Sequence, residues 1–363
     1  MSNAAWETLS NQAIGAAGIV YFIALVVHLA EWAAVRQPAA KKAAAGTTSS
    51  GSAGAAGTAE GDTLVASAPT AVDGTDGVDA PDSERIAFLG RLGVLLTAIG
   101  CAIHFVALVG RGMAADPNRV PWGNMYEFTI SGTFVVTLLY LVLYRKFRLG
   151  WMAPLVLTFT VSVLMIAVIW LHEPVAPLAE SLNSYWLVIH VVSAVIATGA
   201  FTLGGIASIM YLVRMRAERK AAGQPLTGWM GRVPSLPALD RIAYRVHAFA
   251  FPVWTFAVLI TGPIWAHEAW SRYWNWDPKE VWAFITWVVY AGYLHARATA
   301  GWKGRNAAIL ALVGMATLWF NFIGINYFST SSQHSYAGER PAVIAERSLP
   351  DTREVGPAAA SVP

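Results

Sequence analysis

Eight stretches of about 20 mostly apolar residues dominate this sequence, and they leave few folds open to it. A helix rises 1.5 Å per residue, so about 20 residues cross about 30 Å of hydrocarbon. Of the 363 residues, 56% are hydrophobic and 13% are charged, which is too apolar for one water-soluble domain. The sequence therefore predicts an all-α, polytopic membrane bundle of about eight transmembrane helices. The expected spans are approximately Ile14–Val35, Ile86–Val109, Phe128–Tyr144, Trp151–Trp170, Trp186–Val213, His247–Trp265, Val281–Ala296 and Ala307–Tyr327.

The basic residues in the connections indicate the orientation, because Lys and Arg are retained on the cytoplasmic side. Most of them lie in the connections that are inside when the N-terminus is outside. We therefore expect both termini outside, in the plasma membrane of a bacterium. The net charge of +3 follows from this asymmetry and gives no reason to expect a nucleic-acid partner.

Composition divides the chain into four parts. Residues 1–36 form an extra transmembrane helix, and residues 37–85 are mostly small and polar, which predicts a disordered cytoplasmic linker. One continuous unit, 86–337, follows, and 338–363 form a flexible external tail. The first helix thus looks like an appendage. Within the main unit, residues 221–245 are expected to lie along the inner membrane surface.

Residues 265–280, here called the tryptophan loop, carry Trp270, Trp274 and Trp276 close together. Tryptophan is favoured at the membrane–water boundary, because its ring is apolar and its N–H needs a partner. Anchoring a helix requires one or two such residues, so the alternative of simple anchors leaves a surplus of flat aromatic surface. The surplus suits a large planar ligand, and haem is the obvious candidate.

Asp277 has a local explanation as the start of the seventh span. Asp277 as N-cap, Pro278 at the first helical position and Glu280 two residues later form a capping box. This capped helix start would hold the tryptophan loop in a fixed position relative to the seventh span. The helix N-terminus would favour a propionate nearby.

Two histidines are expected to lie on the outer side with this loop. His190 lies near the outer end of the fifth span, and His334 follows the last span. Two imidazoles on opposite faces of a porphyrin give six-coordinate haem iron. The alternatives are a helix-packing role for His190 and a solvated tail position for His334.

His295 lies in the inner half of the seventh span and so cannot share a haem with His190. It could ligate a separate inner haem. His28 and His247 are expected at a similar depth, and the sequence does not decide whether either completes that site or is structural.

Cys101 is the one cysteine, so thiol chemistry must come from a partner. The outer connection 117–128 carries Trp122, Asn124 and Glu127 and is expected to form a second wall beside the loop.

Together these residues resemble the CcsA/ResC family of System II cytochrome c biogenesis proteins, which belong to a haem-handling superfamily defined by a WWD motif. The family pattern, roughly W-G-x-x-W-x-W-D-P-K-E, stands here as Trp270-Ser-Arg-Tyr-Trp-Asn-Trp-Asp-Pro-Lys-Glu280, with Ser271 where glycine is usual. The resemblance covers about 86–337. Further matching segments are Asn124–Glu127, Ser184–Val191, Tyr293–Arg297 and His334–Tyr336.

The resemblance implies a site and a function. His190 and His334 correspond to the two external haem ligands, and His295 to the ligand of an inner haem whose second ligand is associated with a ResB/CcsB-type partner. Haem b would be carried across the membrane and attached to apocytochrome c, with a separate protein reducing the thiols. An exporter or carrier without synthase activity is the alternative. A quinol-oxidising b-type cytochrome is disfavoured, because His190 and His295 lie on different helices without an internal repeat.

Overall fold

The computed structural model describes residues 1–34, 80–177, 182–329 and 332, and all the regular secondary structure in this part of the chain is helical, with no strand. The expected all-α polytopic bundle is therefore confirmed. The elements are α1 (Asn3–Ala34), α3 (Ala80–Ala114), α4 (Met125–Phe147), the 3₁₀ turn η1 (Leu149–Met152), α5 (Ala153–Trp170), α6 (Tyr185–Ala221), α7 (Trp229–Arg232), α8 (Leu236–Thr255), the π-helical segment η3 (Phe256–Thr261), α9 (Gly262–Trp270), α10 (Pro278–Ala298), α11 (Arg305–Trp319), a second π-helical segment η4 (Phe320–Gly324) and α12 (Ile325–Phe328).

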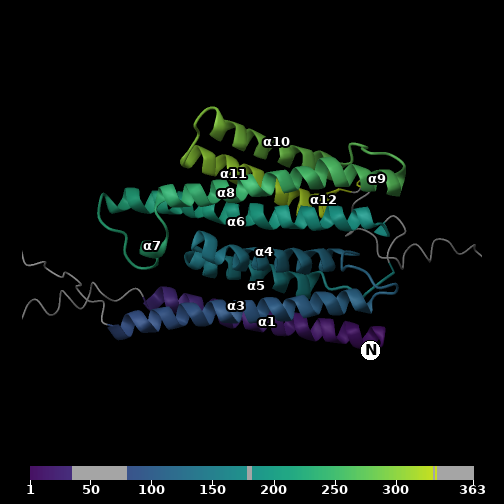
Figure 1. Cartoon of the computed structure of the whole chain (residues 1–363), viewed down its shortest axis with the longest axis horizontal. Helices are drawn as coiled ribbons and strands as arrows, with labels where there is room; N and C mark the ends of the chain where they lie inside the picture. Colours follow the sequence, from purple (N-terminus) through teal and green to yellow (C-terminus); the bar gives the residue numbers. More distant parts are fainter. Residues whose placement is uncertain (35–79, 178–181, 330–331, 333–363) are drawn as a thin grey trace, which may run out of the picture.

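The long helices lie side by side and alternate in direction along the chain (Figure 1). The N-terminus of α1, helix α9 and helix α12 lie at one end of the bundle, here called the site end, and α7 lies at the opposite end. Seven of the described helices, counting continuous runs as one, are long and apolar enough to cross a membrane. The seventh expected span, α10, is the one not counted among them: it has 21 residues but is less apolar.

Two helices begin earlier in the chain than the spans expected from the sequence. The sixth span was expected to begin at His247, but α8, η3 and α9 form one run from Leu236 to Trp270. Residues 236–245 are thus its first turns, with Leu239 and Ala243 buried in the core. The second long helix begins at Ala80, within the expected linker; the rest of that linker and the tail 338–363 lie outside the described residues.

Helix α1 is an integral part of the bundle, which corrects its interpretation as an appendage. It lies along α3, and glycines of α3 allow the close approach. A Cβ on Gly93 would come within 2.5 Å of the His28 ring, and one on Gly100 within 2.8 Å of the Tyr21 ring. Small residues at such an interface let two helix backbones approach within the membrane.

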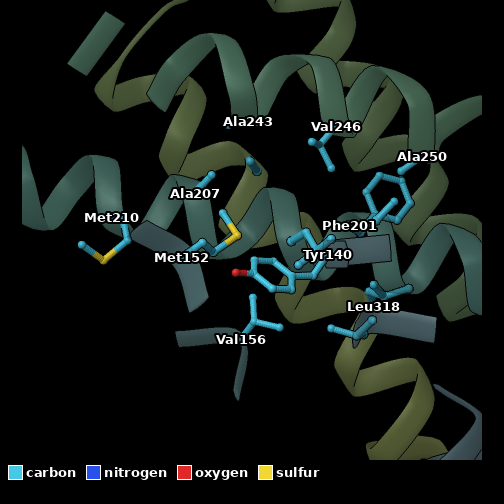
Figure 2. Packing of buried hydrophobic residues seen from close by; sticks show 14 of the residues in the cluster. Tyr140, Met152, Val156, Phe201, Ala207, Met210, Ala243, Val246, Ala250 and Leu318 are labelled. Carbon is cyan, nitrogen blue, oxygen red and sulfur yellow. The ribbon is translucent and has the colours of Figure 1, made fainter. Parts of the chain in front are cut away.

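The main core lies between α4, α5, α6, α8, α10 and α11. Figure 2 shows Tyr140, Met152, Phe201 and Leu318 within it. Phe201 also stacks on Tyr290 of α10 with ring centroids 3.7 Å apart. This packing fixes the helices whose site-end turns form the cavity described next.

Candidate functional site

A largely apolar cavity of about 200 Å³ lies between the site-end turns of α4, α6, α10 and α11 and the run from α8 to α9. Its wall contains His190 of α6 and Trp274 of the loop, which are both predicted site residues, and Trp265 of α9, the first residue of the tryptophan loop as defined from the sequence. Lys279 and Asn321 add polar groups from α10 and η4. A concave, mostly apolar site with a few polar groups is typical of a small-molecule binding site.

His190 is half-buried and held in a defined orientation. Its Nδ1 lies 2.9 Å from the carbonyl oxygen of Ala257, across the interface between α6 and η3. A carbonyl only accepts, so Nδ1 carries the proton and the lone pair is on Nε2, the nitrogen that can bind iron. The ring also stacks on Trp265, with centroids 5.9 Å apart and planes 13° apart.

The π-helical segment η3 makes this contact possible. Its wide turn directs the Ala257 carbonyl to three donors: the Gly262 amide, the Thr261 hydroxyl at 3.1 Å and His190. A Cβ on Gly262 would lie 3.2 Å from the His190 Cε1 atom, so glycine leaves the space for the imidazole. Such π-bulges recur at functional sites.

The tryptophan loop is shorter than expected, because residues 265–270 belong to α9. Trp265 is buried and contacts Trp270 edge-on, with centroids 4.9 Å apart. Trp274 is half-buried in the cavity wall. Trp276 is 68% exposed, has a φ of 59° and packs edge-on against Trp274. The three tryptophans of the motif thus differ in what they contact.

The expected capping box is confirmed. The Asp277 carboxylate accepts from the Lys279 amide at 2.9 Å, and Glu280 Oε2 accepts from the Asp277 amide at 3.1 Å and the Asn275 amide at 2.9 Å. Both acidic side chains therefore hold the loop against the start of α10.

His334 lies outside the described residues. Ser332, two positions before it, is described, and its hydroxyl donates to Asp277 Oδ1 at 2.8 Å. Ser332 therefore lies directly beside the tryptophan loop.

His295 is exposed on α10, whereas His28 and His247 are buried. The His28 ring packs against Gly93, and the His247 ring lies 2.6 Å from where a Cβ on Gly204 would be. Among the described residues, no hydrogen bond, ion pair or ring contact joins His295 to either of them, since His28 pairs with Glu31 and His247 with Ala243. The structure therefore does not bring together an inner ligand pair.

A cluster of buried ion pairs lies at the site end, and it was not expected from the sequence. The fully buried Glu127 carboxylate accepts from Arg111 at 2.9 Å, from Arg119 at 2.7 Å and from the Gly123 amide at 2.7 Å. Glu127 was expected to form a second wall of the site, but its neighbours Met125 and Phe128 line the cavity instead. An arginine at the end of an apolar helix was the available signal, because it needs a buried partner.

Comparison with known proteins identifies the family. The family described as cytochrome C assembly protein matches residues 122–332, which include the whole cavity wall described above. The chain belongs to this family. Similar curated proteins include the cytochrome c biogenesis protein CcsA of Guillardia theta, which is 33% identical over 257 residues that cover 66% of this chain and 83% of the relative.

Two further relatives carry the same name. The protein of Chlamydomonas reinhardtii is 35% identical over 231 residues, covering 60% of this chain and 61% of its own. That of Synechococcus sp. (strain JA-2-3B'a(2-13)) is 29% identical over 315 residues, covering 72% and 88%. Helices α1 and α3 precede the segment that matches the family.

Proposed function

We propose that this membrane protein of cytochrome c assembly presents haem b at the site end for attachment to apocytochrome c, as one subunit of a holocytochrome c synthase. The observation that carries the proposal is the orientation of His190. Its Nδ1 is bonded to Ala257, so its Nε2 is the ligating atom, and it lies in an apolar wall beside Trp265. Haem is here a substrate that the protein holds and hands on.

The residues of the cavity suit one edge and face of a porphyrin. They are apolar and aromatic, with one imidazole fixed by its second nitrogen. At about 200 Å³ the cavity is smaller than sites of roughly 300–1,000 Å³ that enclose a ligand. The porphyrin would therefore also be covered by groups outside the cavity, and we propose Trp276, the segment carrying His334 and the partner protein for this.

Each predicted site residue has a role in this proposal. His190 and His334 are the two axial ligands, and Trp270, Trp274 and Trp276 surround the ring. Asp277 holds the loop and the chain leading to His334, as its bonds to Lys279 and Ser332 indicate. These residues position haem, and positioning alone can supply a large part of a barrier reduction.

The covalent step needs groups that this chain does not provide. Each client thiol adds across a haem vinyl group, with the sulfur bonding to one carbon and the hydrogen passing to the other. Cys101 is buried and free, so it cannot keep the client thiols reduced. We therefore propose a separate thiol-reducing protein and a ResB/CcsB-type membrane partner that completes the site for apocytochrome c.

His295 would ligate haem earlier on its route, at the inner half of α10. Its exposure on the outside of the bundle supports a second ligand from the partner, since neither His28 nor His247 contacts it. The same proposal places the site end outside the plasma membrane of a bacterium, with both termini outside and surrounding lipid along the apolar helices.

A reconstitution tests this function. The full chain is expressed with a ResB-type partner and a CxxCH client in cells that lack their own assembly system. We expect haem b in the purified complex by pyridine haemochrome and covalently attached haem in the client by haem staining. Bound haem without attachment would identify a carrier or exporter, and haem-free protein from haem-replete cells would contradict both functions.

A further inference from the structure

Two buried polar atoms in the cavity wall have no hydrogen-bond partner among the described residues. They are the indole nitrogen Nε1 of Trp274 and the amide oxygen Oδ1 of Asn321, a residue that is only 6% exposed. A buried polar group without a partner costs about 1–3 kcal/mol. Such groups in an otherwise apolar wall indicate that a bound molecule supplies the missing partner.

A half-buried cation, the ammonium of Lys279, lies in the same wall. The Lys279 ammonium donates to Asn326 Oδ1 at 3.0 Å, and both side chains line the cavity. Glu280 also lines the cavity, but one of its carboxylate oxygens, Oε2, accepts from two backbone amides of the loop. The polar part of the wall therefore includes an indole N–H, an ammonium, two primary amides and the Glu280 carboxylate.

The two asparagines owe their position to the π-helical segment η4. Asn321 lies within η4, and Asn326 lies in α12 directly after it. The segment η3, which directs the Ala257 carbonyl to His190, has the same wide geometry and also contributes to the cavity wall. Both irregular segments thus place polar groups at one apolar cavity, and neither is required for crossing the membrane.

We propose that Trp274, Lys279 and Asn321 form a subsite for a carboxyl group of the planar substrate, that is, for a porphyrin propionate. Trp274 and Lys279 donate to the carboxyl oxygens. The Asn321 amide pairs with a carboxyl in either state, because its NH₂ donates to a carboxylate and its oxygen accepts from a carboxylic acid. This inference rests on the proposed haem site and gives its substrate a defined direction: one propionate edge towards α10 and η4.

The test compares haem with its dimethyl ester, which keeps the iron and both vinyl groups and removes both acidic groups. Both are titrated into the purified full chain and followed by absorbance. We expect haem to bind at least about tenfold more tightly than the ester, as for the loss of a buried hydrogen-bonded or charged contact. In Asn321→Leu, binding of haem should weaken towards that of the ester, and binding of the ester should stay within about twofold.

Two further variants keep the result interpretable. Asn321→Asp has the same shape and adds a negative charge, so it should weaken haem binding and spare the ester. Asn306→Leu makes the same substitution at an exposed position at the other end of α11 and should change neither. If both Asn321 variants retain the wild-type preference for haem over the ester, the carboxyl subsite is wrong while the haem site stands. If neither porphyrin binds, or binding is the same in His190→Ala, the haem site itself is wrong.

Discussion

The Nδ1 atom of His190 lies 2.9 Å from the carbonyl oxygen of Ala257 in a π-helical turn of the neighbouring helix. This bond joins two helices that are distant in the chain, and it fixes both the tautomer and the plane of the imidazole. A metal-binding histidine commonly has such a partner on its second nitrogen, because a loosely held ring binds metal more weakly. The predictions below follow from the way this contact is built.

Gly262→Ala should weaken haem binding. The new methyl group would meet the His190 ring at 3.2 Å and the Ala257 carbonyl at 3.0 Å, so the imidazole must move or its bond must lengthen. Loss of such a supporting contact lowers metal affinity by about 10- to 100-fold. Haem titration of the purified protein measures this. The control is Gly292→Ala in α10, where the added methyl group meets nothing within 4 Å and haem affinity should not change.

Alanine substitutions of the loop tryptophans should differ in their effects on haem occupancy and thermal stability. Trp274→Ala should lower haem occupancy of the isolated protein, because Trp274 lines the cavity and each aromatic pairing contributes about 0.5–1.5 kcal/mol beyond area. Trp265→Ala should lower both haem occupancy and thermal stability, since Trp265 is buried and stacks on His190. Trp276→Ala should have the smallest effect on occupancy without the partner. If all three variants keep the haem content of the wild type, the loop is an interfacial anchor and not a haem-binding element.

Arg111→Met should destabilise the site end strongly. The substitution leaves the buried Glu127 carboxylate without its ion-pair partner in α3. Breaking such a buried pair costs about 3–5 kcal/mol. The melting temperature in detergent should fall well below that of the wild type. Glu218→Gln breaks a pair whose carboxylate is 37% exposed, which should cost at most about 1 kcal/mol. Similar melting temperatures for the two variants would mean that the buried cluster does not hold this end together.

His295→Ala should reduce the amount of haem at the site end without changing its ligands. His295 lies about 14 residues, or roughly 21 Å, along the helix from Val281. One porphyrin cannot connect that depth with the site of His190. The residual haem should keep a bis-histidine absorption spectrum and should disappear when His190 is also replaced. A five-coordinate spectrum of the residual haem would instead assign His295 to the same site.

The fold and the family were predictable from the sequence because both depend on local patterns. Apolar runs define the helices, and the Asp277 capping box with its neighbouring tryptophans is a contiguous motif. The start of α8 was missed, because its first turns carry charge that is compensated only in the fold. Arg297 of α10 pairs with Asp240 of α8 at 2.8 Å, and no local pattern reveals that pairing.

The detailed geometry of the site could not be predicted from the sequence, because it also depends on contacts between distant segments. His190 was a predicted ligand, but its bond to Ala257 depends on a π-helical turn that hydrophobic periodicity does not indicate. Asn321 was not singled out at all, since one asparagine in an apolar helix has no partner in the sequence to indicate its direction. The close packing of α1 on α3 likewise depends on which helix faces Gly93 and Gly100.

Rescue of variants at the two proposed axial ligands by imidazole tests the proposed haem-presenting site most directly. His190→Ala and His334→Ala are compared in the reconstituted assembly system, with His172→Ala as an exposed control from the loop after α5, near the same end. We expect both ligand variants to insert normally and to lose covalent haem attachment to the client. Added imidazole should partly restore it by occupying the vacated axial position, and the His172 variant should resemble the wild type. Wild-type haem attachment in both ligand variants without imidazole would contradict the assignment of this site.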